Sequence, residues 1–409
     1  NSFPVHPVQS LSRSSRPIPN KKPLNPHFWP FAGFFSRSPE TMSYCLVAKT
    51  NQGGLTIMKG MFRTLTALLM LAALFAPAAS RSTLQAQEKE LVVYSTIFAE
   101  YADKMKAEFE KLNPGVKVYI INPGGTEAMI KKLEAEKGNP QADIMHSGDS
   151  SNYLYAKKQG LLQPYAPTAP GFKPTLDIGG RQLALSDKDN YYHVFNMMFT
   201  GIMVNEDLVK EKKLPLPKNF KDLANPAYKG LVMSANPLKS STAVTNIMAT
   251  YQMYGDKVWD VWDAINKNIP YYSNSSSSIY TLVEKGEFAF TIGLSRPALV
   301  SRKNGNPVNF IFPEDGAMIS DNAMGIVAGA KHPTLAKKFI DFILSDQMQL
   351  FGAEYLYIPV KKGLLPASNP ASLEYVGSQI KTLLLPDPSL EEKARPEIQA
   401  KFGEYIRLK

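Results

Sequence analysis

The sequence predicts an α/β fold in which two lobes are each built on a largely parallel sheet. Strands alternate with amphipathic helices through short turns, and the same order of elements recurs in a second half of the chain. Composition is uniform across both halves, with no flexible linker between them. Residues 88–409 also exceed the usual size of a single core. We therefore expect two lobes joined by strands rather than two independent domains.

The first half opens with a strand at 91–94, followed by a helix whose apolar positions up to Leu112 keep helical spacing. A second strand at 116–121 leads through a Gly-Gly turn into a second helix. A third strand at 142–145 leads into a helix that ends near Gly160. Helical crossovers between successive strands indicate parallel pairing.

The second half repeats this order. Its predicted elements are a strand at 231–235, helices at 242–251, 256–267 and 279–283, strands at 288–294 and 309–312, and a helix at 331–343.

We expect the chain to cross between the lobes near 201–205 and again near 312–321. Residues 88–203 and 315–409 then form lobe 1, and residues 204–314 form lobe 2.

Residues 58–86 are typical of a secretory signal peptide. They contain a basic start at Lys59 and Arg63, an apolar run from Leu65 to Phe75, and small residues around Ala78. Residues 1–57 show no periodicity, and we interpret them as an unstructured artefact of start-site choice; a disordered extension is the alternative. The expected location of the mature protein is the periplasm.

The charge of the whole chain, +10 with a pI of 9.3, comes mostly from this N-terminal part. From residue 88 onward, 37 basic and 35 acidic residues leave a net charge of +2, which gives no reason to expect nucleic-acid binding. The single cysteine, Cys45, lies before residue 58. The mature chain therefore has no disulfide framework, thiolate metal site or cysteine nucleophile.

Hydroxyl groups and glycines stand where strands turn into helices. In parallel sheets these turns share one edge, where ligands bind, and helix N-termini there favour anions. Arginine after the strand at 288–294 could grip a carboxylate or phosphate through its planar fork. The predicted ligand-binding residues are Ser95, Thr96, Gly125, Thr126, Asp149, Ser150, Ser241, Thr242, Ser275, Ser295 and Arg296.

Each of these residues also has an ordinary structural interpretation. Ser and Thr are the commonest helix N-caps, and Asp149 is better placed to cap its helix than to bind a ligand amine. Arg296 is equally compatible with a surface loop. The pair Tyr271 and Tyr272 favours packing over iron binding, and the scattered histidines, of which only His146 precedes a candidate turn, predict no metal site and no cofactor.

Several segments together resemble the extracellular solute-binding proteins related to the ferric-iron-binding periplasmic proteins. The likeness runs from about Leu91 to Val360. It is carried by the segments 92–95, 114–118, 124–126, 138–143, 160–162, 228–230 and 336–342. The resemblance implies a type II periplasmic-binding-protein fold: two α/β lobes, a two-stranded hinge and a ligand cleft between them. It also implies an ABC permease and its ATPase as partners.

The sequence departs from the iron-binding pattern at two places. It has Ile97 and Phe98 where the iron branch has a histidine, and Ser295 and Arg296 where that branch has adjacent tyrosines. Other branches take phosphorylated sugars, phosphonates or similar organic anions. We therefore expect a non-enzymatic, monomeric receptor for a small organophosphate, phosphonate or carboxylate.

Two alternatives remain open. One is a ferric-iron-binding protein of an iron importer. The other is a secreted phosphate-ester hydrolase with Ser295 in a nucleophile elbow, although the segment 293–297 lacks the second glycine of that motif.

Overall fold

The computed structural model describes residues 88–409. The interpretations of 1–57 and of a signal peptide at 58–86 lie outside these residues. Within 88–409, no helix combines the length and apolar character needed to cross a membrane.

The strands of the described residues include all six that were predicted, together with eight that were not. In chain order they are β1 (Glu90–Ser95), β2 (Lys117–Ile121), β3 (Ile144–His146), β4 (Leu162–Gln163), β5 (Thr175–Ile178), β6 (Arg181–Ala184), β7 (His193–Asn205), β8 (Val232–Ala235), β9 (Tyr272–Ser273), β10 (Phe290–Leu294), β11 (Val308–Ile311), β12 (Ala317–Val327), β13 (Ile358–Pro359) and β14 (Leu383–Leu384).

Helices follow most strands, as expected. They are α2 (Ala99–Leu112), α3 (Thr126–Ala135), α4 (Ser150–Lys158), α5 (Glu206–Glu211), α6 (Ser241–Tyr254), α7 (Val258–Asn266), α8 (Ser278–Glu284), α9 (Ser295–Lys303), α10 (Pro333–Ile343), α11 (Asp346–Glu354), α12 (Leu373–Gly377) and α13 (Pro388–Arg407), with short 3₁₀ turns at Phe220–Ala224, Pro226–Tyr228 and Gly255–Lys257.

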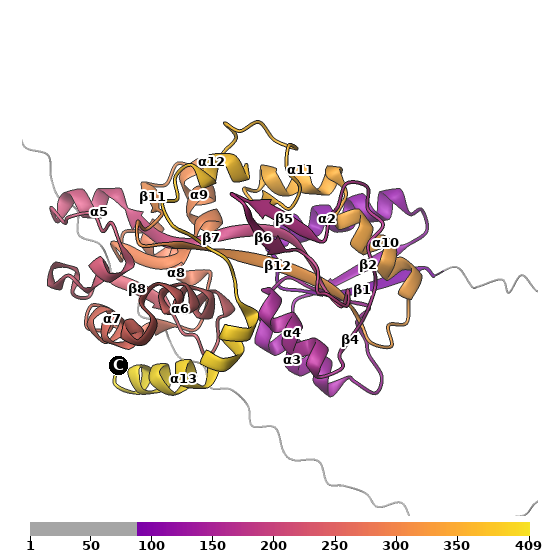
Figure 1. Cartoon of the computed structure of the whole chain (residues 1–409), viewed down its shortest axis with the longest axis horizontal. Coiled ribbons are helices and arrows are strands. Elements are labelled where there is room, and N and C mark those ends of the chain that lie inside the picture. Colours follow the sequence, from indigo (N-terminus) through magenta and orange to yellow (C-terminus); the bar gives the residue numbers. More distant parts are fainter. Residues whose placement is uncertain (1–87) are drawn as a thin grey trace, which may run out of the picture. The chain divides into compact units, whose positions relative to one another are not determined.

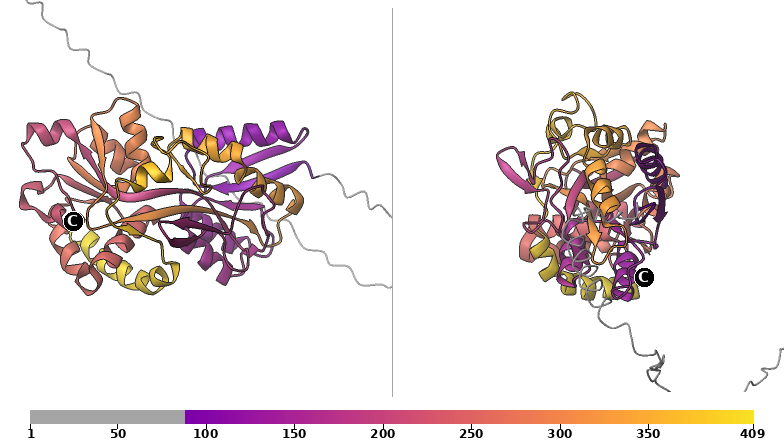
Figure 2. Two further views of the ribbon diagram at one scale, coloured as in Figure 1. Left: turned by 45° about the horizontal axis from the view of Figure 1, so that its top comes forward. Right: turned by 90° about the vertical axis from the view of Figure 1, so that its right-hand side faces the viewer.

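Two long antiparallel strands, β7 and β12, run through both halves of the described chain (Figure 1). Every residue of both strands is buried. On one side β12 pairs with β3, and β3, β1 and β2 are parallel. On the other side β7 pairs with β10, and β10, β8 and β9 are parallel. The predicted parallel sheets are therefore present, joined by an antiparallel pair that is also seen lengthwise in the left view of Figure 2.

Two main hydrophobic cores flank these strands. The first gathers β1, β3, α2, α3, α4 and α10, and includes Phe109 and Phe339, whose ring centroids are 5.2 Å apart. The second gathers β8, β10, α6 and α7 around Trp262. A smaller cluster lies under α8, α9 and β11. Each core is the apolar face of a sheet covered by its crossover helices, which gives two α/β lobes.

The last helix packs with the second core. Ile398, Phe402 and Tyr405 of α13 belong to it, and the ring of Phe402 lies 5.2 Å from that of Trp262. The predicted division assigned all of 315–409 to lobe 1, so the observed packing differs for this helix. The exact lobe boundaries stay a prediction.

The segment after β10 also differs from the loop considered for Arg296. It begins a helix, α9, directly at Ser295, and Pro297 lies in its first turn. Proline is tolerated there because the first backbone N–H groups of a helix have no intrahelical partner.

Candidate functional site

A cavity of about 540 Å³ lies between the two lobes. Its walls are turns at the ends of strands, and its floor belongs to β7 and β12. The first lobe lines it with Thr96, Phe98, Asn122, Gly124 to Thr126 and Ser147 to Asp149, and the second lobe with Lys239 to Thr242, Thr245 and Asn274 to Ser277. The long strands add Met198 and Ser320 to Asn322, and the lining residue Tyr357 directly precedes β13.

Glycines shape the first-lobe wall. Gly125 precedes α3 with a φ of +129°, and Gly148 precedes α4 with a φ of +94°. Both angles lie in the region that favours glycine. A Cβ on Gly148 would lie 2.7 Å from Cγ2 of Thr126, so the absence of a side chain lets the two turns touch. The first turns of α3 and α4 therefore share one wall of the cavity.

The hinge strand β12 holds that wall in place through Asn322. Its Oδ1 accepts hydrogen bonds from Ser147 Oγ at 3.1 Å and from the Gly148 N–H at 3.3 Å. Its Nδ2 donates to Asn196 Oδ1 of β7 at 2.7 Å. Asn322 therefore links both long strands to the cavity-lining turn at Ser147 and Gly148.

The second-lobe wall is rich in hydroxyl groups. Ser240 caps α6 by accepting from the Ala243 N–H at 3.2 Å, and its Oγ lies 3.2 Å from Ser276 Oγ. Ser275 and Ser277 pair with each other at 2.9 Å. Lys239 supplies the single Lys or Arg side chain among the residues that line the cavity. Backbone N–H groups, hydroxyls and one ammonium make this wall suited to an anion.

The lining also carries two carboxylates, Asp149 and Asp321. Asp149 caps α4, accepting from the Asn152 N–H at 3.3 Å and from Asn152 Nδ2 at 2.6 Å. Asp321 accepts from the Ser150 N–H at 2.9 Å. Burial, with the charge of Asp149, raises the pKa of Asp321 to about 6. A ligand amine or hydroxyl placed here would relieve this unfavourable charge.

Seven of the predicted site residues line the cavity: Thr96, Gly125, Thr126, Asp149, Ser241, Thr242 and Ser275. Ser95, Ser150 and Ser295 lie behind it. Ser95 Oγ is 2.9 Å from Nδ1 of the buried His146, and Ser295 Oγ accepts from the Phe199 N–H at 3.1 Å. These two hydroxyls, like the Ser150 N–H, form hydrogen bonds to other residues of the protein.

Arg296 also lies outside the lining, although it is 97% buried. Its guanidinium carbon lies 4.2 Å from the ring centroid of Phe98 and 4.4 Å from that of Tyr357. Its Nε donates to the carbonyl of Tyr355 at 2.8 Å. Phe98 and Tyr357 line the cavity, so Arg296 supports an aromatic wall from behind and does not reach into the cavity.

The tyrosines fit packing better than iron binding. Neither Tyr271 nor Tyr272 lines the cavity, and Tyr272 packs against Phe402 with ring centroids 5.5 Å apart. Tyr357 does line it, but burial raises its pKa to about 12, which disfavours the phenolate that ferric iron requires. Within 88–409, no group of three or more His, Cys, Asp or Glu side chains is placed to hold a metal.

Several residues that line the cavity were not predicted from the sequence. They include the β12 residues Ser320 to Asn322, and Lys239 and Ser240 before α6. Ser320, Asp321 and Asn322 form a polar run inside a fully buried strand. Such a run is an available signal, because buried polar groups require partners or a ligand. Tyr357 could not be found this way, since it reaches the cavity only through pairing of β13 with β7.

Residues 139–380 match the profile of a family described as bacterial extracellular solute-binding protein. The chain belongs to this family. A cavity walled by strand-end turns of two lobes is consistent with such a solute-binding protein, and family members are binding proteins that work with ABC permeases.

This solute-binding protein is 30% identical over 228 residues to an uncharacterized protein of Haemophilus influenzae, an alignment covering 55% of this chain and 64% of that protein. It is 24% identical to the thiamine-binding periplasmic protein of Brucella abortus, covering 80% of this chain and 95% of that one.

A solved structure with the same fold is the periplasmic binding protein AfuA from Actinobacillus pleuropneumoniae with fructose-6-phosphate bound. The identity is 25%, the TM-score 0.68, and the match covers 78% of this chain and 99% of that chain. The solute-binding protein thus has the type II periplasmic-binding-protein fold expected from its sequence.

Proposed function

We propose that this protein is the periplasmic substrate-binding component of an ABC importer and that its cavity holds a small anionic solute carrying amine or hydroxyl groups. The solute is delivered to a membrane permease with its ATPase. The observation that carries the proposal is the cavity between the lobes, which is lined by helix N-termini and hydroxyl groups from both lobes, one lysine and two carboxylates.

Anion binding rests on the ends of α3 and α6 together with Lys239. A helix N-terminus contributes roughly 0.3–2 kcal/mol to binding an anion. A hydrogen bond to a charged group contributes roughly 1.5–3 kcal/mol. Two helix ends and several hydroxyl or ammonium donors therefore reach the ~8 kcal/mol of a micromolar complex. A phosphate, phosphonate or carboxylate has the acceptor oxygens that such donors require.

The two carboxylates narrow the ligand class. Side chains lining the cavity carry one base, Lys239, against Asp149 and Asp321. A purely anionic solute would be repelled by these two carboxylates. A solute with an ammonium group or sugar hydroxyls at its far end would instead donate to these carboxylates. Sugar phosphates and aminoalkyl phosphonates have this polarity.

The donor set supports binding over hydrolysis. No histidine or cysteine is among the residues that line the cavity in the described chain, and Ser295 is buried behind it. A serine nucleophile needs a neighbouring base. We propose a role without catalysis.

Titration calorimetry tests the proposal with fructose 6-phosphate, 2-aminoethylphosphonate, thiamine, citrate and ferric citrate as probes. We expect micromolar or tighter binding of a phosphate- or phosphonate-bearing probe. Lys239→Gln should weaken it by roughly tenfold, about 1.4 kcal/mol. Lys229→Gln, an exposed lysine outside the cavity, serves as the control. Binding of ferric citrate alone, with a visible charge-transfer band, would instead establish the iron alternative.

A further inference from the structure

The C-terminal helix α13 contacts both lobes, although none of its residues lines the main cavity. Its second half is anchored in the second core by Ile398 and Phe402, and Tyr405 Oη donates to Asp263 of α7 at 2.6 Å. Its first half reaches α3 and α4 of the first lobe. Pro396, which has no backbone N–H to donate, lies between the halves.

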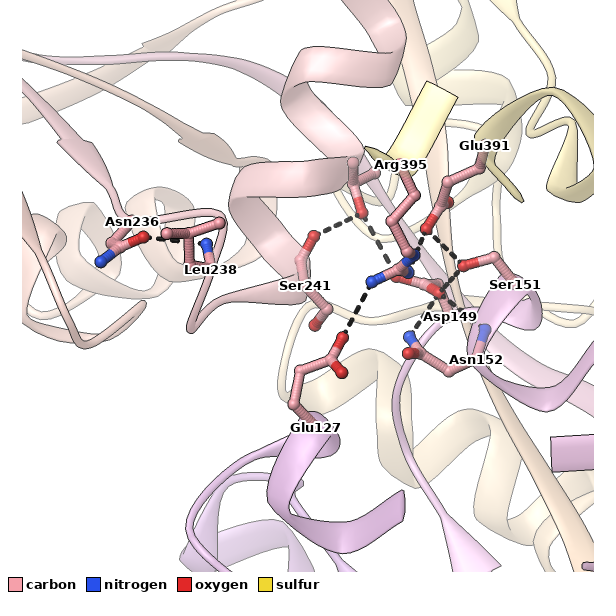
Figure 3. A network of polar contacts seen from close by, with 10 residues as sticks. Glu127, Asp149, Ser151, Asn152, Asn236, Leu238, Ser241, Glu391 and Arg395 are labelled. Atoms are coloured by element: carbon pink, nitrogen blue, oxygen red, sulfur yellow. Dashed lines mark hydrogen bonds and ion pairs between the residues drawn. The ribbon is translucent and has the colours of Figure 1, made fainter. Parts of the chain in front are cut away.

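Arg395 is the main link from this first half to the first lobe. Its Nη1 donates to Oε1 of Glu127 at 3.0 Å, and its Nη2 donates to Oε1 of Glu391 at 2.7 Å (Figure 3). Glu127 is the second residue of α3 and follows the cavity-lining Thr126. One guanidinium fork therefore joins a carboxylate of α13 to the start of a ligand-facing helix of the other lobe.

Glu391 makes a second link. The hydroxyl oxygen of Ser151, in the first turn of α4, lies 2.6 Å from a carboxylate oxygen of Glu391 and 2.6 Å from one of Asp149. A serine hydroxyl has one hydrogen and can donate to only one of them. A proton held on Glu391 satisfies the other contact. Burial and the charge of Asp149 raise the pKa of Glu391 to about 8, in agreement with this geometry.

The same network reaches the cavity through Asp149 and Thr245, which both line it. Thr245 Oγ1 of α6 lies 3.4 Å from Asp149 Oδ2 across the lobes, and it donates to the Ser241 carbonyl at 3.1 Å. Figure 3 shows Arg395 and Glu391 beside Asp149, Ser151 and Asn152.

The charges around Arg395 come from every element that packs against it. Glu391 is on α13, Glu127 is on α3 and Asp149 precedes α4, while Asp321 of β12 adds a further carboxyl next to Asp149. The guanidinium thus lies opposite the first-lobe carboxylates Glu127 and Asp149, while its hydrogen bond to Glu391 holds it on α13. Without it, the ion pair between α13 and α3 is lost.

We propose that Arg395 is a positioning residue for ligand binding, a clasp by which α13 holds the two lobes in the arrangement that encloses the cavity. It does not touch the solute. Its effect on affinity rests on the proposed binding function, but its effect on the distance between the lobes does not.

The chain offers a matched control on the same helix. Lys401 pairs with Asp263 at 3.2 Å, and the two lie on α13 and α7, helices that both contribute residues to the second core. The side-chain exposures are similar: 29% and 48% for Lys401 and Asp263, and 28% and 38% for Arg395 and Glu127. Arg395→Gln breaks a link between lobes, whereas Lys401→Gln breaks a link within one lobe.

Pulsed electron spin resonance measures the distance between the lobes without any ligand. In full-length protein with Cys45→Ser, spin labels are attached at Lys131→Cys on α3 and Lys257→Cys beside α7, both exposed positions on different lobes. Arg395→Gln should broaden the distribution and shift it to longer distances. Glu127→Gln should shift it in the same direction by less, and Lys401→Gln should leave it unchanged.

Calorimetry with fructose 6-phosphate supplies the second readout. Arg395→Gln should raise Kd by roughly tenfold, mostly through faster dissociation, and Lys401→Gln by less than about twofold. An unchanged distance distribution in Arg395→Gln overturns the clasp, and so does tighter binding. If no variant binds any probe while the distance still shifts, the proposed solute class fails and the clasp stands.

Discussion

Arg296 shows how one buried charge can serve a ligand site from outside it. Its guanidinium lies against the rings of Phe98 and Tyr357, which line the cavity, and it belongs to α9, whereas Phe98 precedes α2. Cation–π contacts of this kind contribute about 0.5–2 kcal/mol each. The sequence predicted direct contact between Arg296 and an anion. In the structure, Arg296 would instead affect ligand affinity indirectly, by supporting the rings of Phe98 and Tyr357.

Arg296→Ala should raise Kd for fructose 6-phosphate by roughly tenfold, about 1.4 kcal/mol, because Phe98 and Tyr357 lose their support. It should also lower thermal stability, since it leaves a cavity and an unpaired Tyr355 carbonyl. Calorimetry and thermal unfolding measure the two effects.

Arg302→Ala, an exposed arginine of the same helix, is the control and should change neither quantity. Arg296→Lys should behave like the alanine variant in affinity, because an ammonium cannot stack against two rings as a planar guanidinium does. Wild-type affinity and stability in Arg296→Ala would contradict this account.

At the scale of elements, the starts of α4 and α6 combine side-chain caps with positions in the cavity lining. Ser240 and Asp149 each satisfy free N–H groups of their own helix and also line the cavity. The structure confirms the capping interpretation of Asp149, and contact of these residues with a ligand stays a prediction.

The contact between α13 and α4 makes stability depend on pH. In the unfolded chain, the glutamate side chain has its ordinary pKa of about 4.3 and loses its proton near that pH. In the folded protein the pKa of Glu391 is raised to about 8. Between these values the folded state keeps a proton that the unfolded chain has released. The free energy of unfolding contributed by Glu391 should therefore fall as pH rises from about 4.3 to about 8.

Glu391→Gln removes this titration and should flatten the decline. Urea unfolding at pH 5 and pH 8 should show a smaller loss of stability in the variant than in the wild type. Asp321, with a pKa near 6, leaves a residual slope that ends at about that pH. Glu404→Gln, an exposed glutamate elsewhere on the same helix, is the control. Equal slopes in Glu391→Gln and wild type would show that Glu391 is not held protonated.

At the scale of residues 88–409, the paired strands β7 and β12 connect the two lobes. Their register is interrupted by a bulge between Asn322 and Ala323, beside the cavity floor. Gly201 of β7 has no room for a side chain, because a Cβ would lie 2.6 Å from the Ile311 carbonyl. Short segments of two strands are the usual place for a hinge that changes its backbone angles while the lobes stay rigid.

Small-angle scattering should therefore show a smaller radius of gyration when fructose 6-phosphate or another binding solute is added. Fructose, which lacks the phosphate, should leave the radius unchanged at the same concentration. The reason is that only an anion can bind the helix ends of both lobes at once. A solute that binds tightly without compaction would contradict closure between the lobes.

Much of this fold follows from local patterns. Strands such as β1 and β10, and helices such as α2 and α10, were predicted within about two residues, because apolar spacing reports which face of an element is buried. Seven of the eleven predicted site residues line the cavity, since parallel strands bring their carboxyl ends to one edge.

The long strands β7 and β12 could not be predicted in the same way. Both are buried along their whole length, so neither shows the alternation of a half-exposed strand. The contact of α13 with the second core also depends on residues more than 100 positions away, such as Trp262 and Asp263.

The sequence by itself determined the alternation of elements, the apolar cores and the donor chemistry of the turns, since these depend on neighbours a few residues apart. Tertiary structure alone decided that Arg296 supports an aromatic wall, that Asp321 lies on the cavity floor and that Arg395 joins the lobes. These roles depend on which distant segments meet, and that is set by the packing of the whole chain.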